Sequence, residues 1–362
     1  MRKKTILVIF GGMSGEHDIS LSSASFISEA LSHCEEYRTI TVGITKEGDW
    51  YLYTGPYSRM RKREWLDDDY VKRAALSLDA QNPALVVFQE DGRYETIPID
   101  CVFPVMHGRY GEDGTMQGLL EMAHVPFVGC GVAASALAMD KVLACALFEQ
   151  KGIPHTPWHH VDEMSWHQDK AAYVDFLAQT FECPIFVKPS RGGSSLGITK
   201  VLSKEALKEA VDKAFLFDRR VVVEQGAVGR EVEIGGLGGY NDPELSPIGE
   251  IVPDRAFYDY DSKYEEDSSS ELIIPADLDA SVVSDIRSIA RKAWCALDLY
   301  GLARIDFFVT NEGVVLLNEI NTMPGFVSIS MYPRLFRHAG YTDETLMRRL
   351  VELAFEREDR SS

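Results

Sequence analysis

Residues 303–321 read A-R-I-D-F-F-V-T-N-E-G-V-V-L-L-N-E-I-N. Apolar and β-branched residues on both sides of Glu312-Gly313 predict a β-hairpin with its turn at that pair. With two or four residues in the turn, Asp306 lies directly opposite Glu319. Side chains alternate between the two faces of a strand, so one face of the hairpin carries four polar side chains: Arg304, Asp306, Glu319 and Asn321.

Facing carboxylates of this kind predict a metal site. Asp306 and Glu319 would repel each other unless a cation lay between them, and Asn321 adds a carboxamide oxygen. Oxygen ligands suit Mg²⁺, which keeps water molecules and shares its remaining positions with substrate phosphates. The alternative is a solvated acidic face on an edge hairpin, although surface pairs usually alternate in charge.

A second stretch, K-P-S-R-G-G-S-S-L-G at residues 188–197, follows the apolar run 185–187 and suggests phosphate binding. Lys188 supplies a positive charge at a strand end, and the glycines and serines offer backbone N–H groups and hydroxyls. The stretch lacks the G-x-x-x-x-G-K-[ST] pattern, so an ordinary hairpin turn is an equal alternative. Lys141, in a helix predicted over 135–150, is by itself only a surface lysine.

The N-terminal stretch G-G-M-S-G-E (11–16) separates a predicted strand, 5–10, from a predicted helix, 21–31. It lacks the G-x-G-x-x-G spacing of a dinucleotide site. Glu16 stands at the carboxyl end of the predicted sheet, where α/β folds bind ligands, and its carboxylate favours an ammonium group over a phosphate. The alternative is an acidic residue in the first turn of a helix.

The size and charge of the chain exclude several classes of protein. A chain of 362 residues exceeds the size of one hydrophobic core, so we expect two or three domains with a site between them. Its formal net charge of −19 opposes binding to nucleic acid or to anionic lipid. No apolar run approaches the roughly 20 residues that cross a bilayer, and the first apolar run is too short for a signal peptide. The six cysteines show no metal-binding spacing. We therefore expect a cytoplasmic protein with no nucleic-acid or membrane partner.

Strand-like and helix-like runs alternate along the chain and predict an α/β fold. Residues 50–90 are predicted as a peripheral hairpin and helix with a solvated face. Residues 254–270 have little to bury and are predicted as a lid. Further elements are predicted at 39–45, 99–106, 115–123, 185–188, 197–201, 204–217 and 221–225.

Seven motifs, in this order, resemble the D-alanine–D-alanine ligase family of the ATP-grasp superfamily. The resemblance runs from residue 6 to about residue 333 and is weakest between 50 and 97. The motifs are G-G-M-S-G-E-H-D-I-S (11–20), H-G-R-Y-G-E-D-G-T-M-Q-G (107–118), A-M-D-K (138–141), V-K-P-S-R-G-G-S-S-L-G (187–197), F-Y-D-Y-D-S-K-Y (257–264), A-R-I-D (303–306) and N-E-I-N-T-M-P-G-F-V-S-I-S-M-Y-P (318–333).

The resemblance implies a three-domain ATP-grasp fold with ATP between the central and C-terminal domains. Residues 1–129 would form an N-terminal α/β domain with the first D-alanine site, and residues 130–224 the central subdomain. Residues 225–362 would form the C-terminal domain, with the lid 254–270 and the metal hairpin 303–321. A homodimer is expected from the family.

The resemblance also implies the nucleotide site. ATP would contact Lys141, Lys188, Ser195, Glu224, Gln225, Ala227, Glu231, Lys263 and Asn318. Two Mg²⁺ or Mn²⁺ ions would bind Asp306, Glu319 and Asn321, in agreement with the hairpin argument. Gln225 departs from the family, in which many members carry lysine or glutamate there.

The implied reaction joins two D-alanines for peptidoglycan precursors. The first carboxylate attacks the γ-phosphorus of ATP, and the second D-alanine attacks the resulting acyl phosphate as a free amine. The implied catalytic residues are Glu16, Ser194, Tyr264, Arg304 and Gly325. The implied substrate-binding residues are Glu16, His107, Lys263, Arg304, Ser330 and Met331.

The resemblance leaves the second substrate to be argued from individual positions. Tyr264, a neutral phenol in the lid, favours D-alanine over D-lactate, since a histidine there marks the ester-forming relatives. A D-alanine–D-serine ligase or another ATP-grasp carboxylate–amine ligase is the alternative. A non-catalytic nucleotide-binding protein would be expected to lack a metal ligand or Arg304, and both are present.

Overall fold

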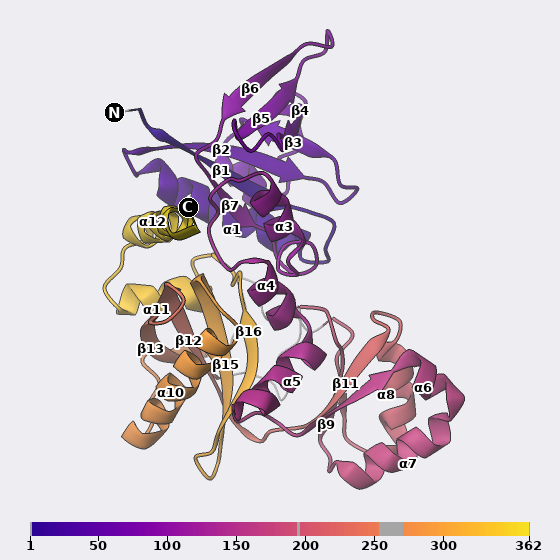
Figure 1. Cartoon of the computed structure of the whole chain (residues 1–362). Coiled ribbons are helices and arrows are strands. Elements are labelled where there is room, and N and C mark those ends of the chain that lie inside the picture. Colours follow the sequence, from indigo (N-terminus) through magenta and orange to yellow (C-terminus); the bar gives the residue numbers. More distant parts are fainter. Residues whose placement is uncertain (1, 194–195, 253–270, 362) are drawn as a thin grey trace.

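The computed structural model describes residues 2–193, 196–252 and 271–361. The described residues form three β-sheets that follow one another along the chain, with helices packed on them (Figure 1). Within these ranges every helix is too short or too polar to span a bilayer. The predictions for Ser194, Ser195, Lys263, Tyr264 and the lid 254–270 lie outside the described residues.

The first sheet has the strand order β6-β5-β4-β3-β2-β1-β7. The three strands at one end of this order, β2, β1 and β7, are parallel, and the others are antiparallel. Alternate residues of β1 pack on opposite sides: Val8 in one core with α1, and Leu7 in another with α3. Helices therefore cover both faces, as is usual around parallel strands. The elements are β1 (Lys4–Gly11), α1 (His17–Ser32), β2 (Tyr37–Ile44), β3 (Trp50–Tyr53), α2 (Tyr57–Arg61), β4 (Val71–Leu76), β5 (Ala84–Phe88), β6 (Tyr94–Pro98), β7 (Cys101–Val105) and α3 (Thr115–Met122).

The peripheral hairpin and helix predicted over 50–90 are present as β3, α2 and β4, but the prediction that this segment has a solvated face is wrong in large part. Strands β3, β4 and β5 extend the first sheet, and Trp65 is buried against Phe10 of β1. Leu85 and Val87 are fully buried. The buried residues lie mostly in two short apolar runs, 50–53 and 84–88, that charged segments separate, so the segment looks polar when its composition is averaged.

The second sheet, of order β10-β9-β11-β8, is antiparallel. Its strands and the helices packed on them share one hydrophobic core. The predicted helix 204–217 is shorter: a 3₁₀ turn, Lys204–Ala206, precedes α8, and Ser203 makes no capping bond. Strand β10 begins two residues later than predicted. The elements are β8 (Trp158–Asp162), α6 (Glu163–Gln168), α7 (Lys170–Thr180), β9 (Ile185–Pro189), β10 (Thr199–Val201), α8 (Leu207–Ala214) and β11 (Arg220–Gln225).

The third sheet, of order β14-β13-β12-β15-β16, is also antiparallel. Its core includes Trp294 of α10 and Phe307 of β15. The elements are β12 (Gly229–Gly238), β13 (Glu244–Val252), β14 (Glu271–Ile273), α10 (Ala280–Ala296), β15 (Gly301–Thr310), β16 (Val315–Asn321) and α11 (Met331–His338).

The single helix predicted over 135–150 is two helices, α4 (Val132–Met139) and α5 (Lys141–Lys151). Asp140 between them has an extended backbone, with φ −95° and ψ 101°. Its carboxylate accepts the N–H of Leu143 and so caps α5. Aspartate is preferred at such caps and disfavoured inside helices, which explains why the break falls at this residue.

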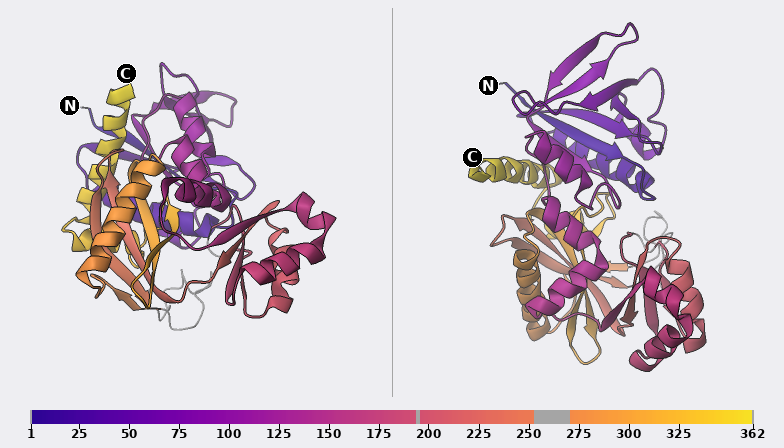
Figure 2. Two further views of the ribbon diagram at one scale, coloured as in Figure 1. Left: turned by 60° about the horizontal axis from the view of Figure 1, so that its bottom comes forward. Right: turned by 45° about the vertical axis from the view of Figure 1, so that its right-hand side comes forward.

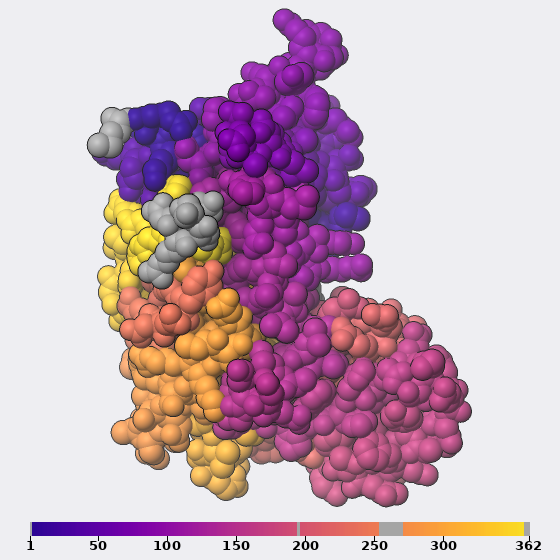
Figure 3. All heavy atoms as spheres, in the orientation of Figure 1, coloured from indigo at the N-terminus to yellow at the C-terminus, as the bar shows by residue number. Residues whose placement is uncertain are grey.

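The last helix, α12 (Asp343–Ser361), returns to the first sheet. Leu346, Met347 and Leu350 share a hydrophobic core with β1 and α1. Arg357 donates to the carbonyls of Phe127 and Gly129 at 2.8 Å each. Two views show both chain ends on the same side of the molecule (Figure 2), and the space-filling view shows the C-terminal atoms beside the N-terminal ones (Figure 3).

Candidate active site

A cavity of about 170 Å³ lies among residues of all three sheets. A smaller cavity adjoins it and shares Lys141, Asn318 and Glu319 with it. The smaller one also contains Lys188 and Glu224. Of the residues predicted for the site, those lining the larger cavity are Glu16, His107, Lys141, Glu231, Arg304, Asp306, Asn318, Glu319, Asn321, Gly325, Ser330 and Met331.

The hairpin of β15 and β16 pairs Asp306 with Glu319 as predicted, but between the bulge and the turn the pairing register is shifted by one residue. Val309 pairs with Val315, and if this register continued along the strands, Asp306 would face Asn318 instead of Glu319. A β-bulge between Asp306 and Phe307 restores the predicted pairing and leaves Asn318 as the extra residue. A bulge turns neighbouring side chains toward one face. Accordingly, Asn318 and Glu319 both line the two cavities.

Arg304 is held between two carboxylates. It donates to both oxygens of Asp306 at 2.7 Å and pairs with Glu233 at 2.9 Å. Burial opposes the charge of Arg304, but the two carboxylates outweigh it and raise its pKa well above the ordinary value. Glu233, on β12 directly opposite Asp306, was not predicted. The alternation R-E-V-E-I at 230–234 would have placed it on the face of Glu231.

The donor set around Asp306 fits a magnesium ion. Asp306 and Glu319 face each other, and Asn321 lies 3.0 Å from a carboxylate oxygen of Asp306. Among the described residues, no three His, Cys, Asp or Glu side chains gather as a metal cluster. Mg²⁺ has octahedral coordination, so two carboxylates and an amide leave positions for phosphate oxygens and water.

Glu16 lies between two glycines from different sheets. It follows β1, and Gly108 follows β7, the parallel neighbour of β1. A Cβ atom at Gly108 would be 2.2 Å from Glu16 Oε2, and one at Gly193 would be 2.5 Å from it. Gly108 also has a φ of +69°, which other residues rarely adopt. Both glycines therefore allow the backbone to approach the carboxylate.

A buried chain of hydrogen bonds joins His107 to the segment 322–326. His107 Nδ1 donates to the Met323 carbonyl at 2.9 Å, since a carbonyl can only accept. Its Nε2 then accepts from Ser23, whose oxygen accepts the Phe326 N–H. Burial lowers the pKa of His107 to about 4, so the ring is neutral at pH 7. Both ring nitrogens bond to protein groups in this arrangement, and the substrate contact predicted for His107 stays a prediction.

Glu112 braces the same segment and was not predicted, although it belongs to the quoted motif 107–118. Its carboxylate accepts the N–H groups of Gly108 at 2.8 Å and Met323 at 3.0 Å. Burial, helped by the charge of Glu16, raises the pKa of Glu112 to about 8. Gly325, the predicted oxyanion donor, thus lies between Met323 and Phe326, whose backbones are both hydrogen-bonded to residues near the first sheet.

The predicted ATP residues divide into two groups. Lys188 donates to Glu224 at 2.6 Å, and Lys141 to the Gly192 carbonyl at 2.8 Å. Burial opposes the charge of Lys188, but Glu224 outweighs it and raises the pKa. By contrast, Gln225 and Ala227 line neither cavity. The Gln225 side chain instead bonds to the backbone of Glu182.

The N-terminus of α11 opens into the larger cavity at Ser330 and Met331. The first N–H groups of a helix have no partner within it and favour a negatively charged ligand. Ser330 Oγ accepts the Val327 N–H at 3.1 Å, which fixes the hydroxyl beside these groups. A carboxylate is the ligand that suits this end of the cavity.

Comparisons with known proteins agree on one family. The model of the D-ala D-ala ligase N-terminus matches residues 5–130, and that of the C-terminus matches residues 147–352. The chain is 44% identical to D-alanine–D-alanine ligase of Acetivibrio thermocellus, over 98% of this chain and 96% of that one. It is 42% identical to the corresponding ligase of Thermoanaerobacter sp., over 98% of both.

Solved structures give the same result. The VanG D-Ala:D-Ser ligase of Enterococcus faecalis has a TM-score of 0.86 and 35% identity, and the match covers 98% of this chain and all of that one. The D-alanine–D-alanine ligase of Coxiella burnetii has a TM-score of 0.85 and 32% identity, covering all of this chain and 96% of that one. These matches confirm the predicted α/β fold of this family. The domain boundaries and residue roles stay predictions.

Proposed function

Since this chain belongs to the D-alanine–D-alanine ligase family, we propose that it joins two D-alanines with ATP, through a D-alanyl phosphate, to supply peptidoglycan precursors. The observation that carries the proposal is the single cavity in which the Asp306–Glu319 pair, the cation Lys141 and Glu16 meet. It brings a phosphate-binding end and an ammonium-binding end together on one substrate path.

ATP occupies the end of the cavity between the second and third sheets in this proposal. Lys141 and Lys188 bind its phosphates, and their charges offset the negative charge of phosphoryl transfer. For Lys188 this requires leaving the 2.6 Å contact with Glu224 or sharing it with the nucleotide. Glu224 then binds the adenine side and Glu231 the ribose. Gln225 and Ala227 would contribute through their backbone, because their side chains lie outside both cavities.

Asp306, Glu319 and Asn321 would hold two magnesium ions. When bound, the ions neutralise phosphate charge and align the transferring group. The residues supply the oxygen atoms for this from two facing strands. The nitrogen of the Asn321 side-chain amide donates to Asp306, and rotation of the amide by about 180° would present its oxygen to a metal ion.

The two D-alanines occupy the rest of the cavity. Glu16 pairs with the first ammonium, and its position between Gly108 and Gly193 fixes that charge. Arg304 and the Gly325 N–H stabilise the oxyanion formed when the second amine attacks, a contribution of about 3 to 4 kcal/mol per donor. The N-terminus of α11, at Ser330 and Met331, binds the second carboxylate.

D-alanine is the proposed second substrate, although one structural neighbour is a D-Ala:D-Ser ligase. The curated relatives at 42–44% identity are D-alanine–D-alanine ligases. Met331 offers an added hydroxyl no strong partner, so we expect D-serine to be a poor second substrate. Packing alone often rejects a single hydroxyl by only about 100-fold, which limits this discrimination. We expect D-lactate to be a poorer substrate still, because of Tyr264 in the predicted lid.

The test measures ADP release from ATP and Mg²⁺ with and without D-alanine. The proposal expects D-alanine-dependent ADP and a dipeptide identified by mass spectrometry. Equal D-serine or D-lactate is then added in competition at pH 6 to 8. Mainly D-alanyl-D-serine or the ester would overturn the specificity and leave the ligase assignment intact. ADP release that ignores D-alanine would overturn the ligase assignment itself.

A homodimer and a cytoplasmic location are also proposed from the family alone. Sedimentation of the purified chain measures the first: a molecular mass of about twice the monomer is expected, and a monomer would contradict it. Cell fractionation measures the second, and recovery in the membrane pellet would contradict it.

A further inference from the structure

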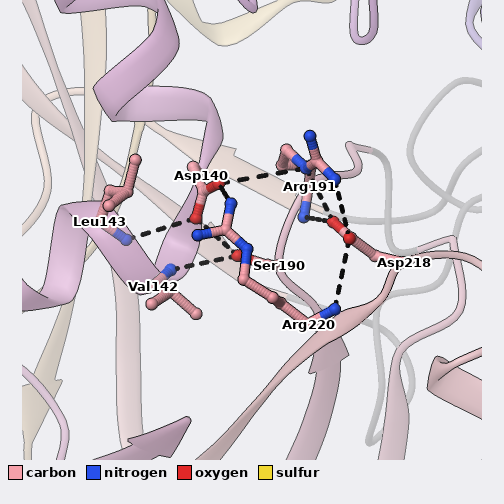
Figure 4. A network of polar contacts seen from close by, with 7 residues as sticks. All are labelled: Asp140, Val142, Leu143, Ser190, Arg191, Asp218 and Arg220. Atoms are coloured by element: carbon pink, nitrogen blue, oxygen red, sulfur yellow. Dashed lines mark hydrogen bonds and ion pairs between the residues drawn. The ribbon is translucent and has the colours of Figure 1, made fainter. Parts of the chain in front are cut away.

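Asp140 stands at the centre of a polar network outside the residues assigned above (Figure 4). It is 3% exposed and forms the one-residue break between α4 and α5. One carboxylate oxygen accepts the Ser190 hydroxyl at 2.6 Å and the Leu143 N–H at 3.3 Å. The other oxygen pairs with Arg220, the first residue of β11.

Ser190 joins the helix break at Asp140 to the predicted phosphate-binding stretch 188–197, called the phosphate loop below. Its carbonyl accepts the Lys141 N–H at 2.9 Å, and its hydroxyl oxygen accepts the Val142 N–H at 3.3 Å. Its own N–H donates to the carbonyl of Arg220 at 2.9 Å. Ser190 is fully buried, so these bonds are shielded from water. The start of α5, the end of β9 and the start of β11 thus meet at one serine.

The next loop residue, Arg191, is anchored by Asp218 and also pairs with Asp140 at 4.0 Å. Arg191 donates to both oxygens of Asp218 at 3.0 Å, and its N–H donates to the same carboxylate at 2.9 Å. Asp218 also accepts the Arg220 N–H. The loop is therefore fixed at residues 190 and 191, and Gly192, which accepts the Lys141 side chain, follows directly.

We propose that Asp140 is a positioning residue for phosphoryl transfer, which acts through Ser190 and Arg220 to hold the first turn of α5, and with it Lys141, at a fixed place beside the phosphate loop. The inference rests on the proposed function, because Lys141 matters only if ATP binds there. A cap alone would need only the bond to Leu143. The bonds to Ser190 and Arg220 come from residues 50 and 80 positions away and serve no helix-capping purpose.

The experiment compares Asp140→Asn with wild type in the steady-state reaction. Asparagine caps a helix about as well as aspartate, so α5 keeps its cap while the charge toward Arg220 is lost. We expect kcat to fall about 10- to 100-fold, because a shift of about 1 Å in a positioning group can cost that much. The KM for the first D-alanine should change less than about twofold, since Glu16 belongs to another sheet.

Two control variants come from helices that pack on the second sheet. Asp169 caps α7 through the Ala172 N–H at 3.0 Å. Asp212, on α8, pairs with Lys170 at 2.6 Å, and neither aspartate lines either of the two cavities. Asp169→Asn should leave both Tm and kcat unchanged, because asparagine caps a helix about as well as aspartate, and Asp212→Asn should lower Tm by loss of its pair with Lys170 and leave kcat unchanged. Ser190→Ala, which removes the hydroxyl bridge and no charge, should lower kcat in the same direction as Asp140→Asn.

A double variant separates positioning from a general structural role. If Asp140 acts through Lys141, then Asp140→Asn with Lys141→Met should lose no more than about threefold beyond Lys141→Met alone. Losses that multiply would overturn the proposal, as would an Asp140→Asn kcat within about threefold of wild type. A wild-type enzyme that releases no ADP would instead overturn the proposed function, on which the inference depends.

Discussion

Gly108→Ala is the sharpest test of the ammonium site. A Cβ atom at this position would lie 2.2 Å from Glu16 Oε2, so the carboxylate must move. An ion-paired hydrogen bond typically contributes about 1.5 to 3 kcal/mol. If the displaced carboxylate loses its contact with the first D-alanine, kcat/KM for that substrate should fall about 10- to 150-fold.

Backbone strain must be separated from this effect. Alanine at the Gly108 φ of +69° costs about 1 to 2 kcal/mol of stability from backbone strain alone. Gly92 has a φ of +81°, and a Cβ there would meet nothing within 4 Å. Gly92→Ala is therefore the matched control, with a similar loss in Tm and no loss in activity.

The assay is ADP formation at saturating ATP and varied D-alanine, with Tm measured in parallel. Gly193→Ala presses on the same carboxylate, 2.5 Å from Oε2, and should lower kcat/KM in the same direction. If Gly108→Ala retains kcat/KM within about threefold of Gly92→Ala, Glu16 does not bind the first ammonium in the position seen here. The substrate assignment at this end of the cavity would then be wrong.

Three further predictions follow from the site. Asp306→Asn should abolish turnover with little change in Tm, because it removes a metal charge, and activity within about threefold of wild type would exclude Asp306 from the metal site. Glu112, whose pKa is raised from 4.5 to about 8, stabilises the fold fully below pH 4.5 and loses this contribution as pH rises through 8. The Tm of wild type should therefore fall relative to that of Glu112→Gln between pH 5 and 9, and a constant difference would contradict the shift. ATP with Mg²⁺ should protect residues 254–270 from proteolysis if they form the predicted lid, and equal cleavage with and without ligand would count against it.

The sequence predicted the pairing of Asp306 and Glu319 but not how it arises. The pairing register next to the turn differs by one residue from the predicted register, and the bulge at Asn318 compensates for this difference. A bulge depends on strand twist and on the neighbouring strands, which a local pattern does not report. The position of Asn318 in both cavities could therefore not be derived from alternation alone.

Long-range contacts explain the other differences. The residues on both sides of Asp140 favour a helix and hide the break, and the Asp140 carboxylate there is held by Ser190 and Arg220, far along the chain. Glu233 shares a face with Glu231 by simple alternation, but its pairing with Arg304 requires β12 to lie beside β15. Residues that come from one hairpin were thus predictable from alternation, and residues brought together by the packing of distant strands were predicted only through the family resemblance or not at all.

The return of α12 to the first sheet has a consequence for synthesis on the ribosome. Strand β1 is synthesised well before α12, yet part of its core comes from Leu346, Met347 and Leu350 of α12. At about 5 to 20 residues per second, the roughly 330 residues between Gly11 and Asp343 take roughly 20 to 70 s to synthesise. During that time one apolar face of the nascent N-terminal sheet lacks its last covering helix. The nascent chain should therefore be a chaperone client until α12 has been synthesised, and truncation before residue 343 should leave an aggregation-prone N-terminal domain.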